Sequence, residues 1–500
     1  MHRPPLAPLL LALLATPLLA APALAAPLTP ADAVRIAVER DPGLRAAGLR
    51  IREQRAAVTA AEGAFDLQIT GRLDYNTSRR TLTVEEPTVD GDVVTLRRRF
   101  DTRQGALDVG LLQPLVWGTR VGLDFANDFT ATDNPFQNCI PGLTSSECYE
   151  TQLRLTLTQP LLRGFGQDVN TAAIEQAEAQ VDAARLQQRE TAEALIATVV
   201  SAWAELAYAA QAVEIRAQAL ALAREQLAAT EAQIEVGRLA PADRPVVAQA
   251  VARRTRELAV ARLALADRRA TLAVWLDRED VSAAPFGEAE AFALTLDAAA
   301  SAAEAENPTI ALRAIERRQL QSSLRVQEDQ GRPRLDLSLV VAQAGISDRY
   351  GDALASLPDN DTHFYGASLE FAWAPANNVA EGETARVRLA MRALEAELQS
   401  LRESVRIEVG EAVRAALAAD TTVELDTEVA ALAADAVEAE RLKFESGRAT
   451  NLDVLQVQQD LAEARLTVAR AEADRLIARV RVQQLTGGLL DAYGLQLAEP

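Results

Sequence analysis

The chain has 500 residues and a net charge of -20, from 51 basic and 71 acidic side chains. Nucleic-acid binding needs a basic surface, so the acidic balance argues against it. Aromatic residues make up only 4% of the chain and alanine dominates long stretches, so extended helix is the expected default structure. The charge by itself favours an ordinary soluble surface over an acidic wall that lines a water-filled passage.

The N-terminus predicts export from the cytoplasm. Arg3 precedes an apolar run from Leu6 to Leu24, and Ala23-Leu24-Ala25 offers a cleavage site, so residues 1–25 are expected to be a signal peptide. Prolines inside the run argue against an anchor helix. No run of eighteen apolar residues follows. The mature chain therefore either stays soluble outside the cytoplasm or spans a membrane as a barrel.

The chemistry-bearing residues are few. Cys139 and Cys148 are the only cysteines, and in an oxidising compartment two close cysteines predict a loop disulfide. Two histidines and two methionines argue against a dedicated metal site. Neither His2 nor His363 lies near a serine or cysteine in a known catalytic pattern, and no glycine-rich phosphate loop is found. We expect no enzymatic activity, no cofactor and no bound metal.

Two long stretches predict coiled-coil helices. In the first, a continuous helix is expected from Thr171 to Glu235, ended by Gly237 and Pro241, with a returning helix over 242–276. Its seam falls at intervals of seven: Val199, Leu206, Val213, Leu220, Leu227 and Ile234. The second seam alternates spacings of four and three: Val387, Met391, Leu394, Leu398, Leu401 and Val405.

The segments that flank these helices alternate apolar and polar residues, as strands do. The apolar positions are Phe65, Leu67, Ile69, Leu73 and Tyr75, then Leu153, Leu155 and Leu157, then Leu335, Leu337, Leu339 and Val341, then Tyr365, Leu369, Phe371 and Trp373. Strands of about ten residues with one face of each kind build membrane barrels. A half-buried soluble sheet would alternate in the same way. The signal peptide and the lack of another core favour the barrel.

The chain also repeats itself. Gly237-Arg238 is followed by Asp243 and Gln249 at the spacing at which Gly447-Arg448 is followed by Asp453 and Gln459, and Asp41-Pro42 recurs as Asn307-Pro308. Because the matches keep their order, we expect two structural repeats. So few strands cannot close a conduit alone, and open edges in lipid leave backbone groups unpaired. Several copies are therefore expected to share one barrel with cyclic symmetry.

With these motifs the chain resembles the TolC-type outer-membrane efflux family over essentially the whole mature sequence. The motifs that carry the resemblance are Asp41-Pro42, the segment 157–164 (LTQPLLRG), Pro333-Arg334-Leu335-Asp336, and the two tips at 237–243 and 447–453. The resemblance implies an α+β membrane protein, with a transmembrane β-barrel shared by a homotrimer and continued by an α-helical tunnel in the periplasm. It also implies docking to a periplasmic adaptor that links the duct to an inner-membrane efflux pump or ABC exporter.

The resemblance also gives roles to the tips. Asp453 and its repeat counterpart Asp243 are expected to narrow the entrance, with raised pKa values because carboxylates on a threefold axis repel one another. The alternative is a helix cap, which we prefer for Asp243 and weigh equally for Asp453. Phe444 stands where some relatives have a tyrosine. Because phenylalanine cannot form a hydrogen bond to a neighbouring hairpin, any gate at the tips must be held closed by other contacts. The expected adaptor contacts are Val236, Gly237, Arg238, Leu239, Gly447, Arg448 and Ala449.

One departure concerns the number of strands. The segment 112–118 (LQPLVWG) echoes 158–164 (TQPLLRG), with alternating runs before and between them. We therefore predict six strands per chain and eighteen in the trimer, four of the six in the first half. Prolines cannot donate to a strand ladder, so the barrel-to-helix transition is expected at Pro114, Pro160 and Pro375.

The sequence thus predicts an outer-membrane channel-tunnel subunit that conducts substrates passively, with a structural periplasmic coiled-coil protein as the alternative. The expected divisions are a signal peptide (1–25), an N-terminal tunnel helix (26–63), first barrel strands and loops (64–163), a first helical hairpin (164–277), an equatorial connector (278–306), a second N-terminal helix (307–332), second barrel strands (333–375), a second helical hairpin (376–486) and a C-terminal tail (487–500).

Overall fold

The computed structural model describes residues 27–87, 89, 91–133, 147–287, 292–359 and 362–497. The expected signal peptide and Cys139 lie outside these residues, so the signal peptide and the Cys139–Cys148 disulfide stay predictions. The elements are α1 (Pro30–Arg40), α2 (Pro42–Glu62), the short 3-10 helix η1 (Gly63–Phe65), β1 (Gln68–Pro87), β2 (Val93–Pro114), β3 (Arg120–Thr132), β4 (Glu147–Pro160), α3 (Gln167–Asn170), α4 (Ala172–Glu235), α5 (Asp243–Leu276), α6 (Leu296–Glu306), α7 (Pro308–Gln330), β5 (Arg334–Ser347), α8 (Tyr350–Asp359), β6 (His363–Ala372), α9 (Asn378–Glu445), α10 (Asn451–Leu485) and α11 (Leu489–Ala492).

The chain divides into two compact units. The first holds the residues up to Asp41 together with Ala192–Ser301 and Glu408–Gln496, so it is helical and contains both turns between long helices. The second holds Pro42–Thr191 and Ala302–Ile407, and it contains the six strands that the structure describes.

The long helices form where the coiled-coil patterns predict them. α4 has 64 residues and α9 has 68. Val199, Leu206 and Leu220 of the first seam are buried, as are Val387, Leu394 and Leu398 of the second. By length and composition, α4 is also apolar enough to cross a membrane, but 44% of its apolar stretch is buried within the chain. That burial is what a coiled-coil seam requires.

Trp203 of α4, in the first unit, is the largest of the fully buried side chains among the described residues. Its indole Nε1–H donates to the carbonyl oxygen of Leu28 at 2.7 Å, and its ring meets Phe286 edge-on at 5.6 Å between centroids. Leu28 also forms a parallel β-bridge with Ala283. The hydrogen bond, the ring contact and the bridge hold the segment before α1 and the segment after α5 against the middle of α4.

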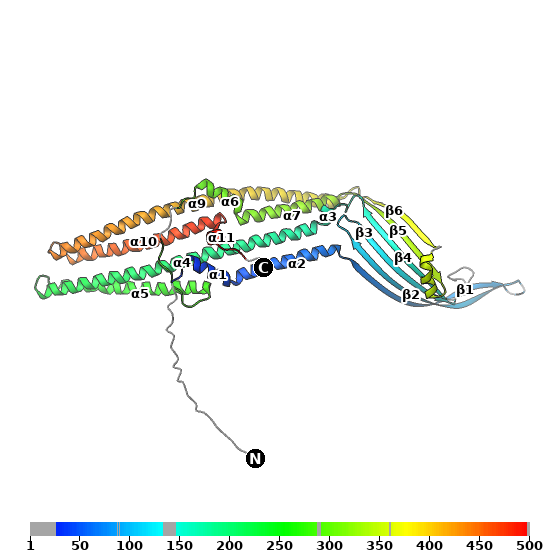
Figure 1. Cartoon of the computed structure of the whole chain (residues 1–500), viewed down its shortest axis with the longest axis horizontal. Coiled ribbons are helices and arrows are strands. Elements are labelled where there is room, and N and C mark those ends of the chain that lie inside the picture. Colours follow the sequence, from blue (N-terminus) through cyan, green and yellow to red (C-terminus); the bar gives the residue numbers. More distant parts are fainter. Residues whose placement is uncertain are drawn as a thin grey trace, which may run out of the picture. The chain divides into compact units, whose positions relative to one another are not determined.

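The second unit is built on one antiparallel sheet with strand order β1-β2-β3-β4-β5-β6 (Figure 1). Among the described residues the sheet has the six strands predicted for the chain, with four of them in its first half. One row of register partners runs across the whole sheet and is apolar throughout: Ile69, Leu111, Leu123, Leu155, Val341 and Tyr365.

Three segments differ from the expected divisions. The N-terminal helix is two helices, because Asp41 adopts an extended conformation and Pro42, which has no N–H to donate, begins α2. The second strand segment contains the helix α8, which packs where Gly345 has no side chain: an added Cβ would lie 2.1 Å from the carbonyl oxygen of Ala353. The connector ends in the helix α6.

Candidate functional site

The two faces of the sheet have opposite chemistry. Apolar side chains gather on one face, here called the apolar face: Ile69, Leu73, Leu107, Val109, Leu111, Val121, Leu123, Phe125, Leu153, Leu155, Leu157, Leu339, Val341, Tyr365 and Leu369. The other, polar face carries Gln68, Thr70, Arg72, Asp74, Asp108, Asp124, Asp128, Gln152, Arg154, Thr156, Thr158, Asp336, Ser338 and Glu370. Leu73 is 80% exposed and Leu369 is 62% exposed, so the apolar face does not serve as a core for the chain itself.

Aromatic side chains lie at both ends of the sheet. Near the loops at one end, the ring of Tyr149 lies 4.9 Å from that of Phe129 and 6.2 Å from that of Tyr350, which begins α8. At the opposite end, Trp117 and Trp373 are more than half exposed. An apolar band flanked by two aromatic girdles is the surface that membrane barrels present to lipid.

The polar face is hollowed near the helices. A cavity of about 590 Å³ lies along it, lined among others by Arg120, Asp124 and Glu370. Arg334 Nε donates to Asp336 Oδ2 at 2.6 Å in the same cavity. These charged groups need water or one another, so this face is suited to line an aqueous passage.

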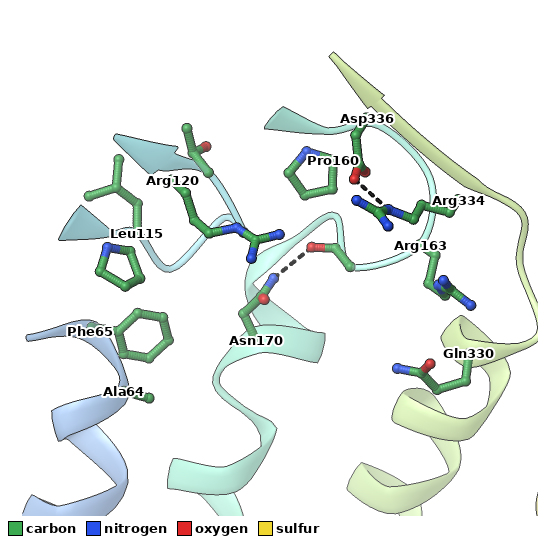
Figure 2. A pocket seen from close by; sticks show the side chains of 14 residues that line it. Ala64, Phe65, Leu115, Arg120, Pro160, Arg163, Asn170, Gln330, Arg334 and Asp336 are labelled. Atoms are coloured by element: carbon green, nitrogen blue, oxygen red, sulfur yellow. Dashed lines mark hydrogen bonds and ion pairs between the residues drawn. The ribbon is translucent and has the colours of Figure 1, made fainter. Parts of the chain in front are cut away.

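The junction between strands and helices holds a second cavity, of about 560 Å³ (Figure 2). Both Pro114 and Pro160 line it at the ends of β2 and β4. The side-chain amides of Gln113 and Gln159 donate to the carbonyl oxygens of these prolines, at 3.0 and 2.8 Å. The structure places Pro375 between β6 and α9. The three prolines thus stand where strands give way to turns or helices.

The echo between 112–118 and 158–164 is also structural. Gly118 and Gly164 both have positive φ angles, +87° and +82°. A Cβ on Gly118 would lie 2.2 Å from the carbonyl oxygen of Gly164, so the turn between β2 and β3 packs directly on the turn after β4. Asn170 Nδ2 fixes the second turn by donating to the carbonyl oxygen of Gly164 at 2.9 Å (Figure 2).

The two turns between long helices have the same geometry. Gly237 and Gly447 adopt left-handed φ angles of +74° and +73°, which glycine allows without strain. The next residue closes each turn: Arg238 N–H donates to the carbonyl oxygen of Gln233 at 2.9 Å, and Arg448 N–H donates to that of Lys443 at 2.8 Å. The residues expected to contact an adaptor lie in these turns. Val236 is 69% exposed, as a docking surface requires.

Both tip aspartates accept a hydrogen bond from a backbone N–H of their own turn. Asp453 completes a capping box with Thr450, the N-cap residue of α10, whereas the N-cap residue of α5 is Ala242 and makes no side-chain capping bond. Thr450 N–H and Oγ1–H donate to Asp453 Oδ2 at 2.8 and 2.7 Å, and Asp453 N–H donates to Thr450 Oγ1 at 3.3 Å. Ala240 N–H donates to Asp243 Oδ2 at 3.1 Å. The backbone and side-chain hydrogen bonds from Thr450 lower the pKa of Asp453, opposite to the expected rise. The expected rise would come from repulsion between the Asp453 carboxylates of different copies, and a single chain has only one of them.

The lowered pKa of Asp453 predicts how the cap responds to pH. A depressed carboxyl pKa stabilises the fold above the ordinary value of 3.8, and this contribution is lost as pH falls through the folded-state pKa. The Thr450 and Asp453 amides are expected to stay protected from hydrogen exchange, after correction for intrinsic rates, from neutral pH down to the folded-state pKa of Asp453. Loss of protection well above it would contradict the capping role.

A buried polar cluster lies close to the tips, and the sequence did not single it out. Asn451 Oδ1 accepts hydrogen bonds from Gln226 Nε2 and Thr230 Oγ1, each at 2.8 Å, so α10 is tied to α4. Thr230 is fully buried and the other two are 7% exposed. The available signal was the position of Thr230, three residues after Leu227 in the seam, where an apolar residue is expected.

Residues 122–276 match the outer membrane efflux protein family. The predicted resemblance to this family is confirmed over these residues. A comparison with curated proteins finds no match to the sequence.

Solved structures of outer membrane channels share the fold. The outer-membrane channel OprN has a TM-score of 0.60 at 15% identity, over 91% of this chain and 89% of that one. The outer membrane protein VceC of Vibrio cholerae scores 0.57 at 14% identity, over 91% and 95%. The open MtrE channel of Neisseria gonorrhoeae scores 0.58 at 16% identity, over 94% and 90%. The predicted outer-membrane localisation agrees with the outer membrane efflux protein family and with these channels.

Proposed function

We propose that the protein is a subunit of an outer-membrane efflux duct, through which substrates pass without chemical change. The observation that carries the proposal is the single-layered sheet with one apolar and one polar face. Each strand presents apolar residues over a length such as Tyr149–Leu157, and a tilted membrane strand needs about nine to eleven residues. The apolar face would meet lipid and the polar face would line the passage.

The sheet edges support a shared barrel. No described strand pairs with the outer edge of β1 or of β6. In lipid, unpaired backbone groups cost several kcal/mol each, so the two edges need partners from other copies. Three copies, as the family resemblance implies, would close a barrel of eighteen strands. Barrel diameter grows roughly linearly with strand number, so one extra hairpin in each copy, which is two of its six strands, would widen the passage.

The first unit supports assembly as well. Exposed apolar side chains recur on α5 at Val246, Val260 and Val274, two heptads apart each time. On α9 they recur at Leu425, Val429 and Leu432, spaced by four and three. Exposed coiled-coil seams call for a second helix, and further copies of the chain would supply it. Each half of the chain runs from two shorter helices through strands to two long helices, which supports two structural repeats.

The tips would face the inner membrane. There Asp453 and Asp243 would narrow the entrance, and the turns at Val236–Leu239 and Ser446–Ala449 would contact a periplasmic adaptor. An inner-membrane efflux pump or ABC exporter would drive transport and choose the substrate.

Single-channel conductance tests the proposal. The mature protein is reconstituted in planar bilayers and compared with Asp453→Asn. The amide keeps an acceptor for Thr450 N–H and removes the charge, so a change in current reports the constriction and not a lost cap. We expect a small cation-selective conductance that rises in the variant. Asp243→Asn, the matched change at the other tip, shows whether the two aspartates narrow the entrance equally.

The outcomes separate the alternatives. A folded helical sample that neither inserts nor conducts would favour the structural periplasmic coiled-coil protein. A channel whose conductance and selectivity are unchanged by both substitutions would support the duct. It would show that the tip aspartates do not form the constriction.

A further inference from the structure

The hairpin of β1 and β2 extends past the rest of the sheet. The two strands, of 20 and 22 residues, pair from Gln68↔Leu112 to Pro87↔Val93. β3 pairs with β2 only from Thr102 onward, toward Pro114. The part of the hairpin beyond Ser78 and Thr102 therefore has no further neighbour among the described strands, and it projects from the loop end of the sheet (Figure 1).

One face of the β1–β2 hairpin is rich in arginine at the base of this projection and along it. Side chains alternate along a strand, so Arg103, Arg99 and Arg97 lie on the face that carries Leu107 and Val109 nearer the helices. Their partners on β1 are Thr77, Thr81 and Thr83 in turn. The three arginines, here called the arginine stripe, thus continue the apolar face beyond Tyr75 on the same side of the sheet.

The stripe keeps its charges available. Arg79 donates from Nε and Nη2 to the two carboxylate oxygens of Asp101, at 2.5 and 2.8 Å, so this acid is already paired. The hydrogen bond from Arg79 lowers the pKa of Asp101, and the charges of Arg99 and Arg103 lower it further. In the part of the chain that the structure describes, Arg97, Arg99 and Arg103 are exposed and form no ion pair.

We propose that the arginine stripe binds the phosphate groups of an anionic glycolipid in the outer leaflet of the membrane. The inference rests on the proposed function, because it takes the apolar face to contact lipid and the loop end to face the exterior. Arginine presents a planar fork of donors that matches phosphate oxygens two at a time. A lipid seated against Leu107 and Val109 would bring its phosphorylated headgroup to the side chains that come next on that face.

The spacing suits a thick headgroup layer. Arg103 stands two residues beyond Gly105, the partner of Tyr75, which is a step of about 7 Å along the strand. From Arg103 to Arg97 the stripe covers about 20 Å of strand, and less along the membrane normal because barrel strands are tilted. A phosphorylated sugar headgroup fills such a layer, whereas a small ion would occupy only one arginine.

Binding of purified lipopolysaccharide to the full mature protein tests the inference. The triple variant Arg97→Gln/Arg99→Gln/Arg103→Gln is compared with Arg80→Gln/Arg98→Gln, which removes arginines from the opposite face of the same hairpin. Loss of charge-assisted hydrogen bonds is expected to weaken binding at least about tenfold in the triple variant and little in the control. Binding should also weaken with added salt.

Chemically dephosphorylated lipopolysaccharide and inorganic phosphate identify the ligand. Weak binding of both to the wild-type protein supports a phosphorylated glycolipid. Equal binding of the dephosphorylated form, equal losses in both variants, or inorganic phosphate bound as tightly as the lipid would each overturn the proposal. Conductance is measured on the same samples. A conducting triple variant that binds lipopolysaccharide like the wild type refutes only the stripe, whereas a wild type that neither inserts nor conducts refutes the duct and the stripe together.

Discussion

Replacing Leu155 by arginine is expected to destabilise the folded protein in a bilayer by about 2 to 4 kcal/mol, the cost of an arginine at the midplane of a membrane barrel. Leu155 lies in the middle of β4 on the apolar face and is 46% exposed in the single chain. If it faces lipid, the guanidinium must be buried in hydrocarbon or must pull water in with it. The measurement is the extent of folding into phospholipid vesicles across a denaturant series.

The neighbouring residue provides a matched control. Thr156 is next to Leu155 in the strand and lies on the polar face, where it lines the cavity with Arg120 and Asp124. Thr156→Arg adds the same side chain on the water-facing side, so we expect a cost well below that of Leu155→Arg. Equal costs for the two substitutions would show that the apolar face does not meet lipid, and would favour a soluble coiled-coil protein.

Replacing Trp203 by alanine is expected to cost about 3 to 5 kcal/mol of unfolding free energy, as truncation of a buried tryptophan does. The side chain is 2% exposed, and it joins α4 to Leu28 by a hydrogen bond and to Phe286 by ring contact. Its loss would leave a cavity and release the segments before α1 and after α5. Chemical denaturation of the detergent-solubilised protein, followed by circular dichroism, measures the loss.

Trp203→Phe separates packing from hydrogen bonding. Phenylalanine keeps much of the ring contact with Phe286 and removes the donor to Leu28, leaving a buried carbonyl without that partner. We expect a cost of about 1 to 3 kcal/mol, below that of Trp203→Ala. A phenylalanine variant as unstable as the alanine variant would assign most of the stability to the hydrogen bond.

The sequence predicts the regular parts of this fold well. A helix expected to begin at Thr171 and end at Glu235 is found over Ala172–Glu235, because seven-residue spacing and the tip glycine are local signals. The similarity of Gln113-Pro114 to Gln159-Pro160 predicts the extra hairpin for a similar reason. Each pair lies at the end of a strand and forms the same hydrogen bond there.

The rest depends on contacts between distant segments. The helix α8 interrupts a region expected to hold only strands, and it is positioned by Gly345, whose missing side chain no local pattern explains. The bond between Trp203 and Leu28 joins residues 175 positions apart. At Asp453 the sequence favours neither a cap nor a constriction, and the capping hydrogen bonds depend on how the folded turn places Thr450. Its role in an entrance depends on other copies of the chain.

The turn between β2 and β3 has a consequence for how such proteins change over evolutionary time. β2 and β3, which are joined by the turn at Gly118, begin and end at the same end of the sheet. The chain therefore enters β4 from the end at which it leaves β1, as it would if this hairpin were absent. A hairpin of this kind can therefore be gained or lost as a cassette, with the helices on either side undisturbed. The width of the proposed barrel could then change in steps of one hairpin, by duplication of a short stretch of gene. The surfaces at the helix turns would keep their shape.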